Sequence, residues 1–294
     1  MALAARHSTA LRRSLAGLLP LRRLSTEALE LTEPQMAAYK TAGWCVPSYR
    51  LPSATLAGLR DALNRLLAVN ASVRPEDLVN AHLEDGSEQA HGITGDSAFL
   101  RHGADPALTS LASALIGKPG VILWGCHIFC KMPGEGRRVP FHQDAPYWPI
   151  EPMEATTIWV ALDDSKTTNG CLQVLPGSHV KGELPHEACG DDAALGAGVR
   201  QDLLADLPEP QAVELEAGQL SAHDTMLVHG SDANSSSRRR AGITYLYMSA
   251  DSHFNREGLK PASQGFGYES RPLFWVRGDH INPKNTHVHD LRQK

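Results

Sequence analysis

The chain has 294 residues, 42% of them hydrophobic and 21% charged, which is typical of a folded globular protein with one large domain or two small ones. Its net charge of −5 argues against nucleic acid as the main partner, and no apolar run approaches the length of a membrane span. The five cysteines show no small-domain disulfide framework, so we expect buried free thiols.

The first 26 residues differ in composition from the rest of the chain. They contain five arginines with several leucines and serines, and the first acidic residue is Glu27. This composition is typical of an amphipathic transit peptide for mitochondria or plastids, and the alternative is a disordered basic tail on a cytoplasmic protein. Removing five arginines from a chain of charge −5 leaves −10, so the single domain expected for residues 27–294 is distinctly acidic.

Three helices are predicted before residue 120. Thr32 is expected to cap the first helix, which Gly43 would end. Ser53 is expected to cap the second, in which leucines recur along one face. A third helix is predicted over residues 105–117, where it starts at an Asp-Pro pair and stops at a glycine. We expect the leucines of these helices to be core residues.

After residue 120 the sequence changes to short β-branched and aromatic runs separated by Gly, Pro and Asn. Such runs without intervening helices predict a sandwich or jelly roll rather than a parallel α/β sheet. The predicted strands are VILWGCHIFCK, RRVPFHQ, TTIWVALDD, CLQVLPGS, AVELEAGQLSAH, TMLVHG and AGITYLYMS. The segment 180–212, rich in Gly, Asp and Pro, interrupts this pattern and is expected to be a lid or surface insertion.

A candidate metal site begins at His142 and Asp144, which stand two positions apart in VPFHQDAPYW. On a strand they would share one face, with Gln143 on the other. An isolated His-x-Asp is more often a hydrogen-bonded surface pair. His229, however, ends a later predicted strand, and a jelly roll can bring that strand end beside the first. Two histidines and a carboxylate with open positions opposite form the facial triad of non-heme Fe(II) oxygenases.

The residues around His229 support this choice of ligand. His223 is the rival, but no basic cluster follows it at a comparable distance, so we expect it to be structural. Three arginines at 238–240 follow His229, although such a cluster alone is more often a solvated surface patch. Strand alternation places Arg238 and Arg240 on one face and Arg239 on the other, so only one register can serve a buried site.

The blocks FHQDAPYW, TIWVALDDSKTTNGCLQVLPGSH and VHGSDANSSSRRR resemble the three signature blocks of the phytanoyl-CoA dioxygenase family, and the similarity runs from about residue 30 to 280. Members are Fe(II)- and 2-oxoglutarate-dependent oxygenases. The resemblance therefore implies a mainly β, double-stranded β-helix fold (a cupin-like jelly roll) with flanking N-terminal helices. It also implies that His142, Asp144 and His229 hold the iron.

The resemblance implies a co-substrate site as well. Arg240, eleven positions after His229, would bind the distal carboxylate of 2-oxoglutarate. Ser231 would assist it, Trp159 would line the same pocket, and His127 falls near another co-substrate position. The chemistry fits, because a planar guanidinium holds a carboxylate through two parallel hydrogen bonds that a lysine cannot make.

Three further residues have less specific readings. Tyr147 and Trp148 are expected in the pocket wall, with a core position as the alternative. His179 would face the substrate or be a hydrogen-bonded turn residue. Related iron halogenases replace the ligand carboxylate by a small residue, so the aspartate at position 144 favours hydroxylation over halogenation.

These features predict an oxygenase that hydroxylates a C–H bond of a small-molecule or acyl substrate. It would consume 2-oxoglutarate and O₂ and release succinate and CO₂, with ascorbate as a candidate supporting reductant. One alternative is a non-catalytic metal-binding jelly roll, a class that tends to lose the co-substrate arginine. Another is a metallohydrolase, which needs a general base that the sequence does not identify. The substrate and the oligomeric state remain open.

Overall fold

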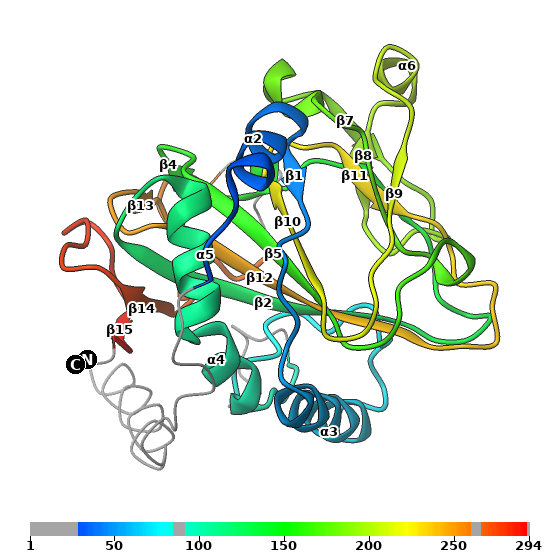
Figure 1. The fold of residues 1–294 in the computed structure, drawn as a ribbon, viewed down its shortest axis with the longest axis horizontal. Helices are drawn as coiled ribbons and strands as arrows, with labels where there is room; N and C mark the ends of the chain where they lie inside the picture. The colour runs from blue at the N-terminus through cyan, green and yellow to red at the C-terminus, as the bar shows by residue number, and fades with distance from the viewer. Residues whose placement is uncertain (1–28, 85–91, 260–265, 293–294) are drawn as a thin grey trace.

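A computed structural model of the chain describes residues 29–84, 92–259 and 266–292 (Figure 1). The predicted transit peptide, residues 1–26, lies outside the described residues. Two large sheets dominate the fold. In order across it, the seven-stranded sheet contains β1 (Trp44–Cys45), β10 (Leu220–Asp224), β5 (Ala155–Ala161), β12 (Arg240–Ser249), β2 (Val121–Lys131), β14 (Leu273–Arg277) and β15 (Val288–Asp290). The four-stranded sheet contains β3 (Val139–His142), β11 (His229–Ser231), β6 (Leu172–Val174) and β9 (Gln211–Val213).

Two short antiparallel strand pairs complete the β structure. One joins β13 (His253–Phe254) to β4 (Ile150–Glu151), and the other joins β7 (His186–Ala188) to β8 (Ala197–Val199). Apart from the parallel β14–β15 pair, the named strands pair antiparallel. This arrangement confirms the predicted jelly roll and excludes a parallel α/β sheet.

The described α-helices are α2 (Glu33–Ala42), α3 (Ser53–Val69), α4 (Ser97–Gly103), α5 (Pro106–Ile116) and α6 (Gln201–Leu204). Three of the five, α2, α3 and α5, begin and end largely where the sequence predicts, whereas α4 and α6 were not predicted. Thr32 caps α2 through a capping box with Gln35, and Gly43 ends it in the left-handed region at φ 83°. Asp105 caps α5 by accepting from the backbone N–H of Ala107.

Three local predictions are wrong. TMLVHG is not a strand up to Val228, and His229 begins β11 (His229–Ser231) rather than ending a strand. Ser53 does not cap α3: it is already the first helical residue, and Pro52 precedes it without a side-chain cap. AVELEAGQLSAH is not one strand, because it divides into β9 and β10, which belong to different sheets. A turn ending at Gly218, whose φ is +87°, redirects the chain between them.

The seven-stranded sheet has two faces with different roles. Alternate residues of its central strands pack against α3, α4 and α5 in the largest hydrophobic cluster, as Ile158, Ile243 and Tyr245 do. The intervening residues of the same strands, such as Thr157 and Thr244, point into a cavity of about 500 Å³. Figure 1 shows α5 lying across one face of this sheet. No helix within the described ranges is long and apolar enough to cross a membrane.

Candidate metal centre and co-substrate pocket

Three predicted ligands converge in this cavity. His142 ends β3, and His229 begins β11 directly opposite it in the antiparallel register. The Nε2 atoms of His142 and His229 lie 3.6 and 3.8 Å from the Oδ1 atom of Asp144. One ligand atom from each of the three residues falls within 4.8 Å of the others, which suits a single metal ion.

The predicted reason for the closeness of His142 and Asp144 is wrong. The strand ends at His142, and Asp144 has helical backbone angles (φ −74°, ψ −44°) at the start of a 3₁₀ turn. Its backbone N–H and that of Ala145 both donate to the carbonyl of Thr225, which holds the bend. The two side chains therefore meet because the chain turns, and not because they share a strand face.

Hydrogen bonds of the Gln143 side chain also stabilise this bend. This side chain is fully buried and donates to the carbonyls of Gly182 and Met226, while its Oε1 accepts from the backbone N–H of Leu184. The residue between the two ligands thus ties β3 to the segment that begins near residue 182. The position of Asp144 depends on these buried hydrogen bonds.

The ligand side chains are oriented by hydrogen bonds behind them. The Nδ1 atoms of His142 and His229 each lie 2.9 Å from a backbone carbonyl, those of Pro140 and Leu227 respectively, so each Nε2 faces the cavity. Thr157 donates to Oδ2 of Asp144 at 2.8 Å. Such supporting contacts fix the tautomer and direction of metal ligands.

The charges of the site favour cation binding. Burial opposes ionisation of Asp144, but the imidazoles of His229, His142 and His223 hold the pKa of this carboxyl well below its usual value. Burial, followed by the nearby His142, lowers the pKa of His229. A carboxylate at Asp144 beside a neutral imidazole at His229 is the protonation state that a metal ion requires.

Arg240 forms the predicted co-substrate end of the cavity. It is 3% exposed at the start of β12, donates from Nη2 to the carbonyl of Gly170, and its Cζ lies 5.5 Å from the centre of the Trp159 ring. Burial lowers its pKa to about 10, so it stays charged at neutral pH. Its Nε has no hydrogen-bond partner within the described part of the chain. An acceptor bound here would satisfy that buried donor.

Gly242 makes room for this arrangement. A Cβ atom at this position would lie 2.0 Å from the Trp159 ring, far closer than atoms approach. The glycine two residues after Arg240 therefore lets Trp159 stand beside the guanidinium.

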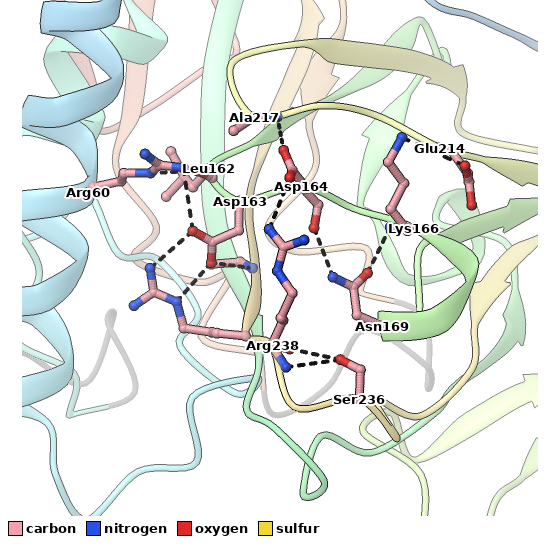
Figure 2. A network of polar contacts seen from close by, with 12 residues as sticks. Arg60, Leu162, Asp163, Asp164, Lys166, Asn169, Glu214, Ala217, Ser236 and Arg238 are labelled. Carbon is pink, nitrogen blue, oxygen red and sulfur yellow. Dashed lines mark hydrogen bonds and ion pairs between the residues drawn. The ribbon is translucent and has the colours of Figure 1, made fainter.

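The other two arginines of the cluster lie outside the cavity. Arg239 pairs with Asp163 at 2.8 Å. Arg238 pairs with Asp164 at 3.0 Å in a partly exposed network that also includes Lys166 and Glu214 (Figure 2). Of the three, only Arg240 reaches the pocket. The predicted strand alternation of Arg238, Arg239 and Arg240 is wrong, because β12 begins at Arg240.

The remaining predicted co-substrate residues also line the cavity: Ser231, Trp159 and His127. His127 accepts from the backbone N–H of Asn80 through Nδ1. Ser231 accepts a 2.7 Å hydrogen bond from the Nζ of Lys131. Lys131 was not predicted: it ends an apolar strand, is fully buried, and has its pKa lowered to about 6 by burial and then by Arg240. Its proximity to Arg240 arises from strand pairing, which spacing does not reveal.

The structure also places four further residues that the sequence analysis considered. Tyr147 and Trp148 line the cavity, as expected. His179 does not; its Nε2 lies 3.2 Å from the carbonyl of Lys40, so it is the turn histidine. His223 is 2% exposed, and its Nε2 lies 3.7 Å from Oδ2 of Asp144, so it belongs to the wall around the triad.

The segment expected to be a lid reaches the same cavity. It contains the β7–β8 pair, and the loop and strand residues 194–197 line the pocket. Its helix α6 does not. Apolar residues of the segment pack in a small cluster with Val228 beside His229.

Comparisons with known proteins agree with this geometry. Residues 39–242 match the phytanoyl-CoA dioxygenase (PhyH) family, and this range includes every predicted site residue. A phytanoyl-CoA dioxygenase of Arabidopsis thaliana is 33% identical over 150 residues, which span 49% of this chain and 50% of that protein. The peroxisomal phytanoyl-CoA dioxygenase of Homo sapiens is 26% identical, with 76% and 70% covered.

A hydroxylase and an epimerase are also among the similar proteins. The L-proline trans-4-hydroxylase of Streptomyces griseoviridis is 28% identical over 275 residues, which span 82% of this chain and 91% of that enzyme. The solved structure of the epimerase SnoN in complex with Fe³⁺, alpha-ketoglutarate and nogalamycin RO is 26% identical, with 80% and 88% covered and a TM-score of 0.61. The family match covers more than half of the sequence, and the chain belongs to the phytanoyl-CoA dioxygenase family.

Proposed function

We propose that this protein is an Fe(II)- and 2-oxoglutarate-dependent dioxygenase that hydroxylates a C–H bond of a small-molecule or acyl substrate. One observation carries the proposal: two imidazole Nε2 atoms and a carboxylate share a cavity with a buried guanidinium whose Nε lacks a partner among the described residues. The donor set suits Fe(II), and the guanidinium suits the far carboxylate of a chelating diacid.

The residues of the proposed site have separate roles. His142, Asp144 and His229 would hold the iron, and Thr157 would keep the carboxylate directed at it. Arg240 would orient 2-oxoglutarate. With O₂, the bound metal and co-substrate supply the oxidising power for hydroxylation, releasing succinate and CO₂. The aspartate at position 144 occupies the place that halide would need, which favours hydroxylation over halogenation.

The proposal predicts how the purified protein responds to iron and co-substrate. Under anaerobic conditions, Fe(II) should bind at one equivalent, and 2-oxoglutarate should then produce a visible charge-transfer absorption. Admission of O₂ should release succinate. A metal-binding protein without catalysis would bind iron but give no absorption change with 2-oxoglutarate, and a metallohydrolase would act on its substrate without 2-oxoglutarate. Either result would contradict the proposal.

We further propose that residues 1–26 are a mitochondrial transit peptide. Their arginine-rich, acid-free composition supports this, whereas the Homo sapiens relative is described as peroxisomal. Leu29 is the first described residue, and it is already part of the folded domain, because its backbone N–H donates to Ser110 and its side chain is buried.

A chain that begins at Ser25 should therefore keep the melting temperature and activity of the full-length protein. A fluorescent reporter fused behind residues 1–30 should enter mitochondria in a eukaryotic cell. Reporter fluorescence in the cytosol, plastids or peroxisomes would rule out the mitochondrial address and leave the enzymatic proposal untouched.

The segment 180–212 is proposed to act as a lid that excludes water and helps to select the substrate. Its residues 194–197 line the cavity, and an oxidising site has to be closed to solvent. Replacing residues 189–196 by two glycines should spare iron and 2-oxoglutarate binding but raise succinate release in the absence of substrate several-fold. Replacing the exposed residues 208–210 of the same segment by two glycines is the control and should change neither. Unaltered coupling in the first variant would show that the lid lies elsewhere.

A further inference from the structure

A second buried guanidinium lies in the wall of the same cavity. Arg271 is 1% exposed and lines the pocket, and it precedes β14 in the C-terminal part of the chain. Its Nη1 donates to Oδ1 of Asn80 at 2.7 Å, and its Nη2 donates to the carbonyl of Phe266. Both acceptors are neutral, so neither compensates the charge.

Arg271 makes no salt bridge within the described ranges, and the one carboxylate whose charge acts on it there is that of the exposed Glu269, two residues earlier. The Cζ of Arg271 lies 5.1 Å from the centre of the Tyr268 ring, a contact that offsets only part of the desolvation cost. Burial lowers its pKa to about 10, so it remains protonated at neutral pH. Its Nε, like that of Arg240, lacks a hydrogen-bond acceptor among the described residues.

Other buried polar groups near Arg271 also lack partners. The indole N–H of Trp124, whose ring packs against Tyr268, has no acceptor in the described part of the protein. Both ring nitrogens of His82, which lies close enough to Arg271 for their charges to interact, are likewise unpaired. Buried polar groups without partners are costly, and of these three residues Arg271 is the one that lines the cavity. The arrangement fits an anion.

The 2-oxoglutarate proposed at Arg240 does not account for this site. Arg240 pairs across β12–β2 with Lys131, whereas Asn80, the partner of Arg271, binds His127. These two positions on β2 are four residues apart, which is about 13 Å along a strand. A short diacid held by the metal and by Arg240 therefore leaves Arg271 without a partner.

We propose that Arg271 binds a carboxylate of the substrate, so that the enzyme acts on a free organic acid; this rests on the function proposed above. A guanidinium recognises a carboxylate through paired hydrogen bonds. Arg240 and Arg271 are the two arginines among the described lining residues, and no lysine joins them. One cationic group suits a monoanion better than the several phosphate charges of a coenzyme A thioester.

The rest of the cavity agrees with an acid of this kind. Trp148, Tyr268, Phe266 and Leu195 give it aromatic and aliphatic walls for the carbon skeleton. The acidic lining residues Glu76 and Asp77 are both held by Arg137, and they would repel a polyanion. An apolar body with one carboxylate is therefore the ligand that the walls accommodate.

The test compares acids with their amides. Protein containing Fe(II) and the co-substrate analogue N-oxalylglycine, which fills the Arg240 end, is titrated anaerobically by calorimetry with hexanoate and phenylacetate and with their primary amides. The variants are Arg271→Gln and the control Arg292→Gln. Arg292 also lies in the C-terminal part of the chain, stacks on Trp275 and donates to the backbone carbonyl of Gly278, but it does not line the cavity.

At least one acid should bind the wild type and Arg292→Gln about tenfold or more tightly than its amide, as expected for a charge-assisted hydrogen bond. Arg271→Gln should lose this preference. If that variant does not fold, Arg271→Lys replaces it and should weaken acid binding without weakening amide binding. Equal binding of acid and amide by the wild type, no binding of either acid, or an unchanged preference in a folded Arg271 variant would overturn the proposal.

The same samples separate this inference from the proposed function. Without the analogue, Fe(II) and 2-oxoglutarate should give the charge-transfer absorption in wild type and in both variants. The absorption together with no acid preference would refute the role of Arg271 alone. Absence of the absorption from the wild type would refute the dioxygenase, whatever the acids do.

Discussion

Replacing His229 by alanine is expected to abolish succinate formation and to weaken Fe(II) binding by more than about 100-fold. Loss of a supporting contact to a metal ligand already costs 10- to 100-fold, and loss of a ligand should cost more. His142→Ala and Asp144→Ala should behave alike, because each leaves two protein ligands. The measurements are the Fe(II) dissociation constant under anaerobic conditions and the initial rate of succinate release.

His179→Ala is the control for the triad, because this half-buried histidine lies outside the cavity. It should leave iron affinity unchanged. His223→Ala provides the sharper comparison, since His223 lies beside Asp144 without being part of the proposed triad. Normal iron affinity in His229→Ala, together with a loss in His223→Ala, would show that the distal ligand is misassigned.

Arg240→Lys should raise the KM for 2-oxoglutarate on the order of 30-fold or more while leaving Fe(II) affinity unchanged. A lysine keeps the charge but cannot make the paired hydrogen bonds, and its shorter head group would leave the Trp159 face. Impairing a buried charge pair costs about 2 to 5 kcal/mol, and 2 kcal/mol corresponds to roughly 30-fold. Initial rates of succinate release at varied 2-oxoglutarate measure the effect.

Arg238→Lys is the matched control for this prediction. The same substitution two residues earlier affects a partly exposed ion pair with Asp164, which contributes little to stability and does not reach the cavity (Figure 2). Its KM should equal that of the wild type. If Arg238→Lys is impaired and Arg240→Lys is not, the co-substrate binds at another basic residue.

Local sequence patterns predict much of the fold. The strands β2, β5 and β12 are long and rich in β-branched and aromatic residues, and each was predicted close to its observed limits. Strand ends were harder to predict where a turn lies within an apparently continuous run, as between β9 and β10. The bend at Asp144 was also missed. It is held by the carbonyl of Thr225, 81 positions away, so no local sequence pattern indicates it.

The candidate site likewise contains residues that the sequence predicts and residues that it does not. His142, Asp144, His229 and Arg240 lie in recognisable sequence blocks, and the structure brings them to one cavity. Lys131 and Arg271 are isolated basic residues in ordinary surroundings, and only tertiary packing shows that they are buried without a salt bridge in the described chain. Their importance depends on desolvation, which a sequence pattern does not report.

The two faces of the large sheet have a consequence for how this protein can change during evolution. Substitution of Ile243 or Tyr245 on the helix-covered face removes core packing and should cost several kcal/mol of stability. Neighbours such as Thr244 and Leu246 face the cavity, where new side chains meet ligand and solvent. Selection for a new substrate can therefore act on every second residue of a strand while the alternate residues keep the domain folded. This separation makes the scaffold evolvable, since new catalytic specificities can arise without a matching loss of the folded protein.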